Sequence, residues 1–429
     1  MKRTGVFIIG VSVSLLIFMG TSVGYAESDV DILLRKFVER GIVSSNVAKE
    51  IKEEIRVEKM DSSTVPVGIE NRVSALEKKK ISLPKWVEKT KLKGDFRLRY
   101  EHKEREGRND VERGRIRYRL GIESKVVDKV VVGLGIASGS NSSTSARSTN
   151  QDLQDVFSTK PFNLDYAFAE YTPTDWVSII GGKFKRKKYL WEPGDLLWDT
   201  DINPEGGSIQ LRHELKDSVN VYTNAGVWIL DESTSDPSDP YLFYVQSGVK
   251  LKDDDSGTDA QVAFTYYSFD SVKGATLDGA LGDNTADSNG DLLYKYTPIV
   301  VSAEAGIKEP FDLPIPRVAA FGEFVHNPDP VDENNGWLLG LKLGDKKVNN
   351  TRKWQLKYLF ARLEKDAFLD VLPDADRYSG GTDIVSHEGI LQIGLKKNVM
   401  LEFDYYSSNR VNGISKPEKI LQTSMNFKF

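Results

Sequence analysis

From Lys91 to the last residue, apolar and polar positions alternate along the chain with a period of two. In residues 91–100 the even positions are apolar or glycine and the odd positions are charged. In residues 421–429 the odd positions are apolar or threonine and the even positions are polar. Side chains two residues apart lie on the same face of a β-strand, so each segment predicts a strand with one apolar and one polar face.

About sixteen such strands are predicted, and the connections between them alternate between short turns and long loops. The strands lie near residues 91–101, 114–125, 130–138, 162–172, 176–185, 207–215, 219–230, 241–251, 259–269, 294–307, 317–326, 337–344, 353–363, 388–396, 399–408 and 419–429. Most of the long connections are rich in Gly, Ser, Asn and Asp, and several exceed about twenty residues, which compact soluble domains rarely tolerate. Short turns at one end and long loops at the other are typical of a membrane barrel.

A closed barrel explains this pattern better than a set of soluble sandwiches. Sixteen strands would need two or three sandwiches, and no linker separates them. Strands of about ten residues match the roughly 9–11 residues of a tilted membrane strand, and closure leaves no unpaired edge in the hydrocarbon. We therefore expect an all-β fold, a transmembrane antiparallel barrel over residues 84–429. A barrel of this size is wide enough to hold water, and its closing strand would place Phe429 at the periplasmic rim.

The first 83 residues predict export followed by a helical segment. Met1-Lys2-Arg3 is basic, residues 5–19 are apolar, and small residues precede Ala26, as in a signal peptide of residues 1–26; an uncleaved anchor is the alternative. Residues 27–83 are expected to be helical and periplasmic. Ser44 is placed to cap a second helix, and residues 69–76 form either a coiled-coil fragment or an isolated helix.

Composition excludes several classes of function. The chain has no cysteine, which rules out covalent c-type haem, iron–sulfur clusters and zinc–thiolate sites. No metal spacing links its four histidines, and no catalytic motif is found, so we expect no cofactor, no metal and no enzymatic activity. A net charge of −5 argues against nucleic acid as a partner.

Four stretches resemble the putative porin family of Gram-negative outer membranes. They are KGDFRLRYE (93–101), RIRYRLG (115–121), GKF (182–184) and WDTDINPEGG (198–207). The similarity extends from the helical segment near Asp29 to the end of the chain. It implies an outer-membrane β-barrel that passes small solutes and has no catalytic residues. The solutes of the family are mostly unassigned, so the resemblance says little about the substrate. It also suggests Phe429 as the signal to the outer-membrane assembly machinery.

The first two strands carry a set of arginines on their polar faces. If these strands pair, the arginines form a basic ladder on one wall of the lumen. The members are Arg97, Arg99, Arg115, Arg117 and Arg119. Arginine suits this role because its charge is permanent and its guanidinium is weakly hydrated. The alternative is that these side chains only keep the lumen wet and pair with neighbouring acids.

The third long loop, Arg186–Gly206, is acidic and contains two tryptophans. In the general porins that the chain resembles, this loop folds into the barrel and narrows it, and we expect the same here. Its acids are Glu192, Asp195, Asp199, Asp201 and Glu205. An acidic loop opposite an arginine ladder would create a transverse field that filters solutes by charge. The alternative is an external loop whose tryptophans pack on the barrel rim.

These features predict a passive channel for small hydrophilic solutes and ions in the outer membrane of a Gram-negative bacterium. A substrate-specific channel and a barrel that sheathes a periplasmic cytochrome or another partner stay open. The expected partners are membrane lipid, the solutes, the assembly machinery and, as an open possibility, two further copies in a homotrimer. Residues 27–83 could bind peptidoglycan, support trimerisation or dock a partner.

Overall fold

The computed structural model describes residues 29–39, 43–61, 88–139, 146–154, 156–232, 239–310 and 313–429. The expected signal peptide (1–26) and the helical stretch near residues 69–76 lie outside these residues. The chain divides into two units, Met1–Ser82 and Leu83–Phe429.

In its described residues, the first unit contains two helices, α1 (Asp29–Glu39) and α2 (Ser45–Asp61). Ser44 caps α2, because its Oγ accepts a hydrogen bond from the backbone N–H of Val47 at 3.4 Å. This agrees with the capping role predicted from sequence. No helix in the described part of the chain is both long and apolar enough to cross a bilayer.

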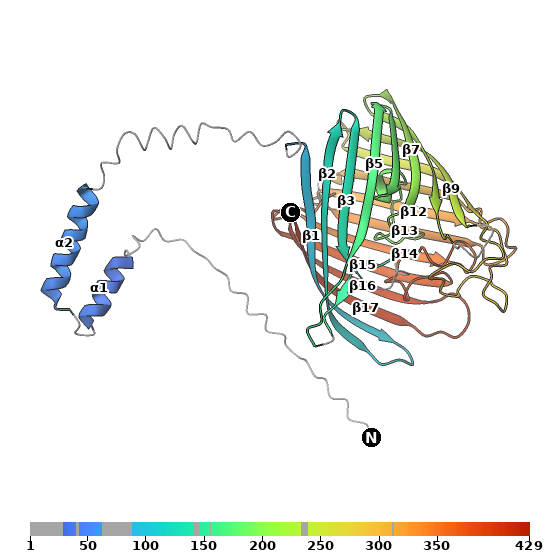
Figure 1. Cartoon of the computed structure of the whole chain (residues 1–429). Coiled ribbons are helices and arrows are strands. Elements are labelled where there is room, and N and C mark those ends of the chain that lie inside the picture. Colours follow the sequence, from blue (N-terminus) through green and yellow to red (C-terminus); the bar gives the residue numbers. More distant parts are fainter. Residues whose placement is uncertain are drawn as a thin grey trace, which may run out of the picture. The chain divides into compact units, whose positions relative to one another are not determined.

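The second unit is one closed antiparallel sheet (Figure 1). Its sixteen long strands are β1 (Thr90–Arg105), β2 (Val111–Val127), β3 (Val130–Ser138), β5 (Phe162–Thr174), β6 (Val177–Lys183), β7 (Glu205–Lys216), β8 (Val219–Ile229), β9 (Tyr241–Asp253), β10 (Thr258–Asp270), β11 (Ile299–Lys308), β12 (Arg317–His326), β13 (Asn335–Gly344), β14 (Trp354–Leu363), β15 (Ile384–Lys396), β16 (Val399–Arg410) and β17 (Glu418–Lys428). A two-residue strand, β4 (Gln151–Asp152), adds to β2. The predicted sixteen-stranded barrel is therefore confirmed.

The barrel closes where β1 pairs with β17, in a register that runs from Asp95 opposite Lys428 to Arg105 opposite Glu418. Two further backbone hydrogen bonds join Gly94 and Phe429, at 2.9 and 3.0 Å. The Phe429 ring covers Gly94 so closely that a Cβ on Gly94 would lie 2.4 Å from the ring and 2.8 Å from the Arg119 carbonyl oxygen. An aromatic ring that covers a glycine in this way pins strand register.

Gly94→Ala should therefore weaken the closing seam. The new methyl group must displace both a ring and a backbone oxygen, and overpacking of this kind costs typically about 1–3 kcal/mol. The folded barrel migrates faster on a gel than the unfolded chain. We expect the folded band of this variant to disappear after samples are heated to a lower temperature than for wild type. Gly389→Ala is the matched control, because a Cβ there meets no atom within 4 Å. Equal melting of the two variants would contradict this role of the seam.

Strands β1 and β2 are longer than predicted. Strand β1 continues to Arg105 and strand β2 already begins at Val111. The first loop therefore has only residues 106–110 in place of the expected 102–113. Cross-strand partners of opposite charge, such as Glu101 opposite Arg113, hold this extension together.

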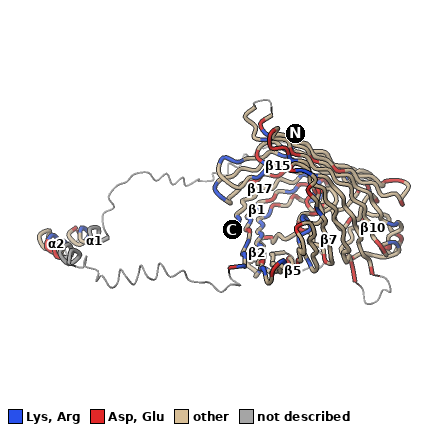
Figure 2. Tube along the Cα trace, turned by 90° about the horizontal axis from the view of Figure 1, so that it is seen from above, with Lys and Arg blue, Asp and Glu red and all other residues tan. Residues whose placement is uncertain are grey.

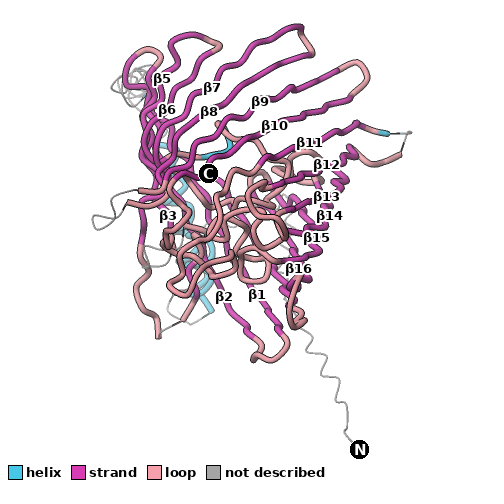
Figure 3. Tube along the Cα trace, turned by 90° about the vertical axis from the view of Figure 1, so that its right-hand side faces the viewer, coloured by secondary structure: helices cyan, strands magenta, loops and turns pink. Residues whose placement is uncertain are grey.

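The sheet alternates as predicted, and its long loops fold inward. In β17 the inward Gln422 and Ser424 are buried, whereas the outward Leu421 is 41% exposed. The loops that matter below are loop 2 (139–161), loop 3 (184–204), loop 5 (271–298) and loop 7 (364–383). Figure 3 shows looped segments gathered inside the ring of strands.

One half of the lumen contains a hydrophobic core, and we call it the apolar half, although it also carries charged residues such as Arg317, Glu304 and Lys342. We call the other half the charged half. Inward side chains of β6 and of β8–β15 pack with loops 3, 5 and 7 into one hydrophobic core, to which β1–β5, β16 and β17 contribute no buried member among the described residues. Lys and Arg instead gather along β1 and β2 (Figure 2). In a barrel the polar faces of the strands are expected to line the lumen, and on this side hydrophobic residues share those faces with polar ones. The physical reason is that folded-in loops remove the inner faces of those strands from water.

Candidate functional site

The five predicted arginines lie together on the lumenal wall of β1 and β2. Arg97 faces Arg117 across the two strands, and Arg99 faces Arg115, so the predicted strand pairing is correct. Arg119 is the next inward residue along β2. Their side chains are largely buried, with Arg97 8% and Arg99 7% exposed.

Neighbouring acids pair with most of this ladder. Asp95 accepts hydrogen bonds from Arg117 at 2.9 Å and from Arg119 at 2.7 Å. Arg115 forms ion pairs with Glu101 and Asp152, at 3.1 and 2.7 Å.

The remaining two arginines differ. Arg99 pairs with Asp376 of loop 7 at 3.4 Å. Arg97 has no carboxylate within ion-pair distance among the described residues, and its Nη2 donates to the side-chain oxygen of Asn150 at 2.5 Å.

Loop 3 lies inside the barrel, where its Trp198 is 2% exposed. The Trp198 ring packs edge-on against Trp228 of β8 and Phe368 of loop 7, at centroid distances of 5.5 and 5.9 Å. Its indole N–H donates to the Tyr267 hydroxyl at 3.3 Å. The loop is thus anchored by its aromatic side chains to the apolar half of the lumen.

The loop acids are mostly turned toward partners within the protein. Glu192 pairs with Arg186, Asp195 with Arg377, and Asp201 with Arg119 at 3.4 Å. Asp201 also accepts hydrogen bonds from Thr149, from its backbone N–H at 3.0 Å and its hydroxyl at 2.9 Å.

Glu205 differs from the other four acids. It is the first residue of β7, not a loop residue as predicted, because β7 begins two residues earlier than its sequence pattern suggests. It is exposed and pairs with Lys183 at 2.7 Å.

Asp199 joins loop 3 to loop 7. Its backbone N–H donates to the Leu372 carbonyl at 2.7 Å, and its Oδ2 accepts a hydrogen bond from the backbone N–H of Ala375 at 2.9 Å. Burial and the nearby charge of Asp201 raise the pKa of Asp199 from 3.8 to about 8.

The contact between loops 3 and 7 should therefore weaken as pH rises. In the unfolded chain Asp199 ionises near pH 4, whereas in the folded protein it stays protonated up to about pH 8. Below pH 4 both states are protonated and nothing is lost. Between pH 4 and 8 each rise of one pH unit lowers the free energy of unfolding by up to about 1.4 kcal/mol, and above pH 8 this loss stays constant. We expect single-channel currents to be noisier at pH 9 than at pH 5. In Asp199→Asn the difference in noise between the two pH values should be smaller. The same pH dependence of the noise in wild type and variant would refute this role of Asp199.

Loop 5 holds loop 7 from the other side. Asn284 donates to the carbonyls of Lys365 and Phe368, at 2.7 and 2.9 Å, and accepts the N–H of Asp370 at 2.8 Å. The Thr285 hydroxyl donates to Asp366 at 2.6 Å. Loops 3, 5 and 7 therefore form one hydrogen-bonded unit, which we call the loop plug.

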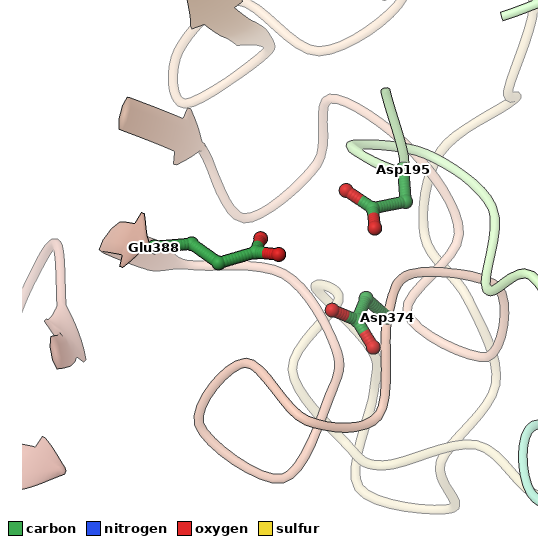
Figure 4. A group of neighbouring side chains, drawn as sticks. All are labelled: Asp195, Asp374 and Glu388. Atoms are coloured by element: carbon green, nitrogen blue, oxygen red, sulfur yellow. The ribbon is translucent and has the colours of Figure 1, made fainter. Parts of the chain in front are cut away.

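Asp195, Asp374 and Glu388 bring three carboxylates together at the base of the loop plug (Figure 4). One oxygen from each lies within 4.8 Å of the others, a spacing that could hold a metal ion. Arg377 occupies the same place, because its Nη2 contacts all three acids, with 2.6 Å to Glu388 and 3.9 Å to Asp374. The guanidinium already supplies the positive charge that a metal would bring, so we interpret the cluster as an ion-pair network.

Sequence reasoning missed three groups of residues. The first comprises Lys185, Lys187 and Lys188 at the start of loop 3, which are exposed, whereas most of the loop acids are half-buried or buried. The run KFKRKK was a signal for these lysines. The second is Arg377, which has no local signal. The third is the hydrophobic core inside the barrel. Runs such as YLFYV (241–245) were a signal for it, because both faces of these strand segments are apolar.

Beside the arginine ladder, aromatic rings of β5 pack directly on glycines of β2 and β3. Tyr166 of β5 lies over Gly121 and Gly135, and Phe168 lies over Gly133. A Cβ on Gly133 would be 2.4 Å from the Phe168 ring. Glycine is therefore needed at these positions for the two rings to pack directly on the strands.

Comparison with known proteins supports a channel. A family model described as "Putative porin" matches residues 35–112, 104–292 and 314–429. OprB of Pseudomonas putida at high pH has a similar fold, with a TM-score of 0.53, 12% identity, and 80% of this chain and 95% of that chain covered. A triple mutant of the Rhodopseudomonas blastica porin aligns with a TM-score of 0.43 and 11% identity over 79% of this chain and 100% of that chain. No curated protein matches the sequence.

Proposed function

Because the chain belongs to the putative porin family and is an outer-membrane porin of a Gram-negative bacterium, we propose where its solutes pass and which charge they carry. The water-filled path runs along the charged half of the lumen, between the β1–β2 wall and the start of loop 3. Its lining includes Arg97, Arg117 and Arg119 on the wall. The channel prefers anions and anionic solutes.

One observation carries this proposal: the exposed charges of loop 3 beside the path are mostly lysines. Lys185 and Lys187 are exposed and lack an ion-pair partner within 4 Å in the described residues, whereas Asp199 and Asp201 are withdrawn into contacts with the protein. The positive groups beside the path that form no ion pair in the described residues are therefore Arg97 on the wall and Lys185 and Lys187 on loop 3. A narrow passage with one sign of charge concentrates the opposite ion.

A salt-gradient measurement tests the proposal. The folded barrel is inserted into a planar bilayer with different KCl concentrations on the two sides, and the reversal potential is read. We expect steady ohmic steps and a reversal potential of the sign that chloride flow requires. A potential of the opposite sign would refute the anion preference, and folded barrel without conductance would refute an open path.

The finer features of assembly are also proposals. We propose that residues 1–26 are a signal peptide, that residues 27–83 lie in the periplasm, and that the barrel of residues 84–429 assembles as a homotrimer. Phe429, which covers Gly94 at the seam, is proposed as the contact read by the assembly machinery. No catalytic role is assigned, because the family and the fold are those of channels. Crosslinking in outer-membrane vesicles tests the trimer.

A further inference from the structure

Arg97 is the one member of the arginine ladder that forms no ion pair with a carboxylate among the described residues. Asp95 binds Arg117 and Arg119, and Asp201 binds Arg119. Asp201 and Glu402 also act on the charge of Arg97, but from beyond ion-pair distance. Arg97 is 8% exposed, and its Nε has no hydrogen-bond partner. A buried cation without a counter-charge is costly, so this position favours an anion.

A second unpaired donor lies beside it. Asn426 of β17 is the direct cross-strand neighbour of Arg97 and is 7% exposed. Its Nδ2 also has no hydrogen-bond partner. Facing residues on neighbouring strands have their Cβ atoms about 5 Å apart, so both donors can reach one group in the lumen.

These two donors suit an oxyanion. The guanidinium and amide N–H groups donate only, and charge-assisted bonds from arginine to a carboxylate or phosphate oxygen are among the stronger hydrogen bonds in proteins. Arg117 and Arg99 flank the position and add to the positive potential. A neutral solute would leave the charge of Arg97 uncompensated.

We propose that Arg97 and Asn426 form a binding site for a small oxyanion, the carboxylate or phosphate group of a permeating solute. This inference rests on the proposed path along the charged half of the lumen and names the chemistry that is recognised there. Arg97 supplies charge and one N–H group, and Asn426 supplies a second N–H group. The site would hold the anion briefly and pass it on along the arginine ladder.

The test is current block in the full-length barrel. Chloride current is measured in a planar bilayer while sodium acetate or sodium phosphate is added in separate experiments. In wild type we expect acetate, phosphate or both to reduce the chloride current by half at a measurable concentration. Arg97→Gln should raise the half-block concentration about tenfold or more, and Asn426→Ala several-fold. Block by acetate alone identifies carboxylates, and block by phosphate alone identifies phosphates; both outcomes support the site.

Two further variants separate a binding site from a general charge effect. Arg97→Lys keeps the charge but loses the guanidinium, so chloride preference should persist while block weakens. Lys308→Gln removes an equal charge at the end of β11 and should leave block unchanged. Each variant is first shown to migrate as a folded barrel. Equal block in wild type and Arg97→Gln, or no block by either anion, would overturn this site while chloride current still supports the channel; absence of current would overturn both.

Discussion

Replacing Arg377 with methionine should release the loop plug and enlarge the conducting path. Arg377 is 1% exposed, donates to the Asp195 backbone oxygen at 2.9 Å and pairs with Asp195 and Glu388. Without it, Asp195, Asp374 and Glu388 lose the cation that they share, and Glu388 keeps only a longer ion pair with Lys357 at 3.8 Å among the described residues. Breaking such a network typically costs about 3–5 kcal/mol. Burial raises the pKa of Asp195, but the Arg377 charge outweighs it and holds that pKa below its ordinary value, so Asp195 stays ionised.

The measurement is single-channel conductance together with limited trypsin digestion. We expect larger and noisier current steps and faster cleavage within loops 3 and 7, with the barrel still migrating as folded. Arg108→Met, at an exposed position in the first loop, is the control and should behave as wild type. Unchanged conductance and unchanged cleavage in Arg377→Met would show that this arginine does not hold the plug.

Exchanging Lys185 and Lys187 for glutamate should reverse the ion preference of the channel. These two lysines are exposed at the start of loop 3, and the Lys185 ammonium lies 4.7 Å from the centre of the Tyr166 ring on the neighbouring strand β5. The double change replaces two positive charges with two negative ones beside the path. Screening acts over about 10 Å at 0.1 M salt, so the effect should be largest in dilute salt.

Reversal potentials in KCl gradients at 0.01 M and 1 M check this expectation. The matched control is Lys216→Glu with Lys308→Glu, the same charge change at the ends of β7 and β11. We expect cation preference in the lysine-to-glutamate loop variant and anion preference in the control. If both variants give the same reversal potential, net charge alone is responsible and the path does not pass loop 3.

The sequence predicts the strands well because their signal is local. Alternation in residues 91–100 specifies which side chains face the lumen, and the pairing of Arg97 with Arg117 follows once β1 and β2 form a hairpin. The position of the arginine ladder was therefore within reach of sequence reasoning. The inward folding of loop 3 was expected only from a family resemblance.

The loop plug could not be predicted, because its contacts join residues far apart in the chain. Asp195 and Arg377 are separated by 182 positions, and Asp199 and Ala375 by 176. No periodicity links such partners, and only the closed barrel brings them together. For the same reason the acids of loop 3 looked like free charges in the sequence, whereas in the fold most of them are at least half-buried and form ion pairs.

The most direct test of the path uses the absence of cysteine from the chain. Single cysteines are placed at Lys187, beside the proposed path, and at Thr265, which faces the apolar half and is 1% exposed. A negatively charged thiol reagent is then added during single-channel recording. We predict a stepwise fall in current for Lys187→Cys and no change for Thr265→Cys. A fall for Thr265→Cys with none for Lys187→Cys would show that solutes cross the other half of the lumen.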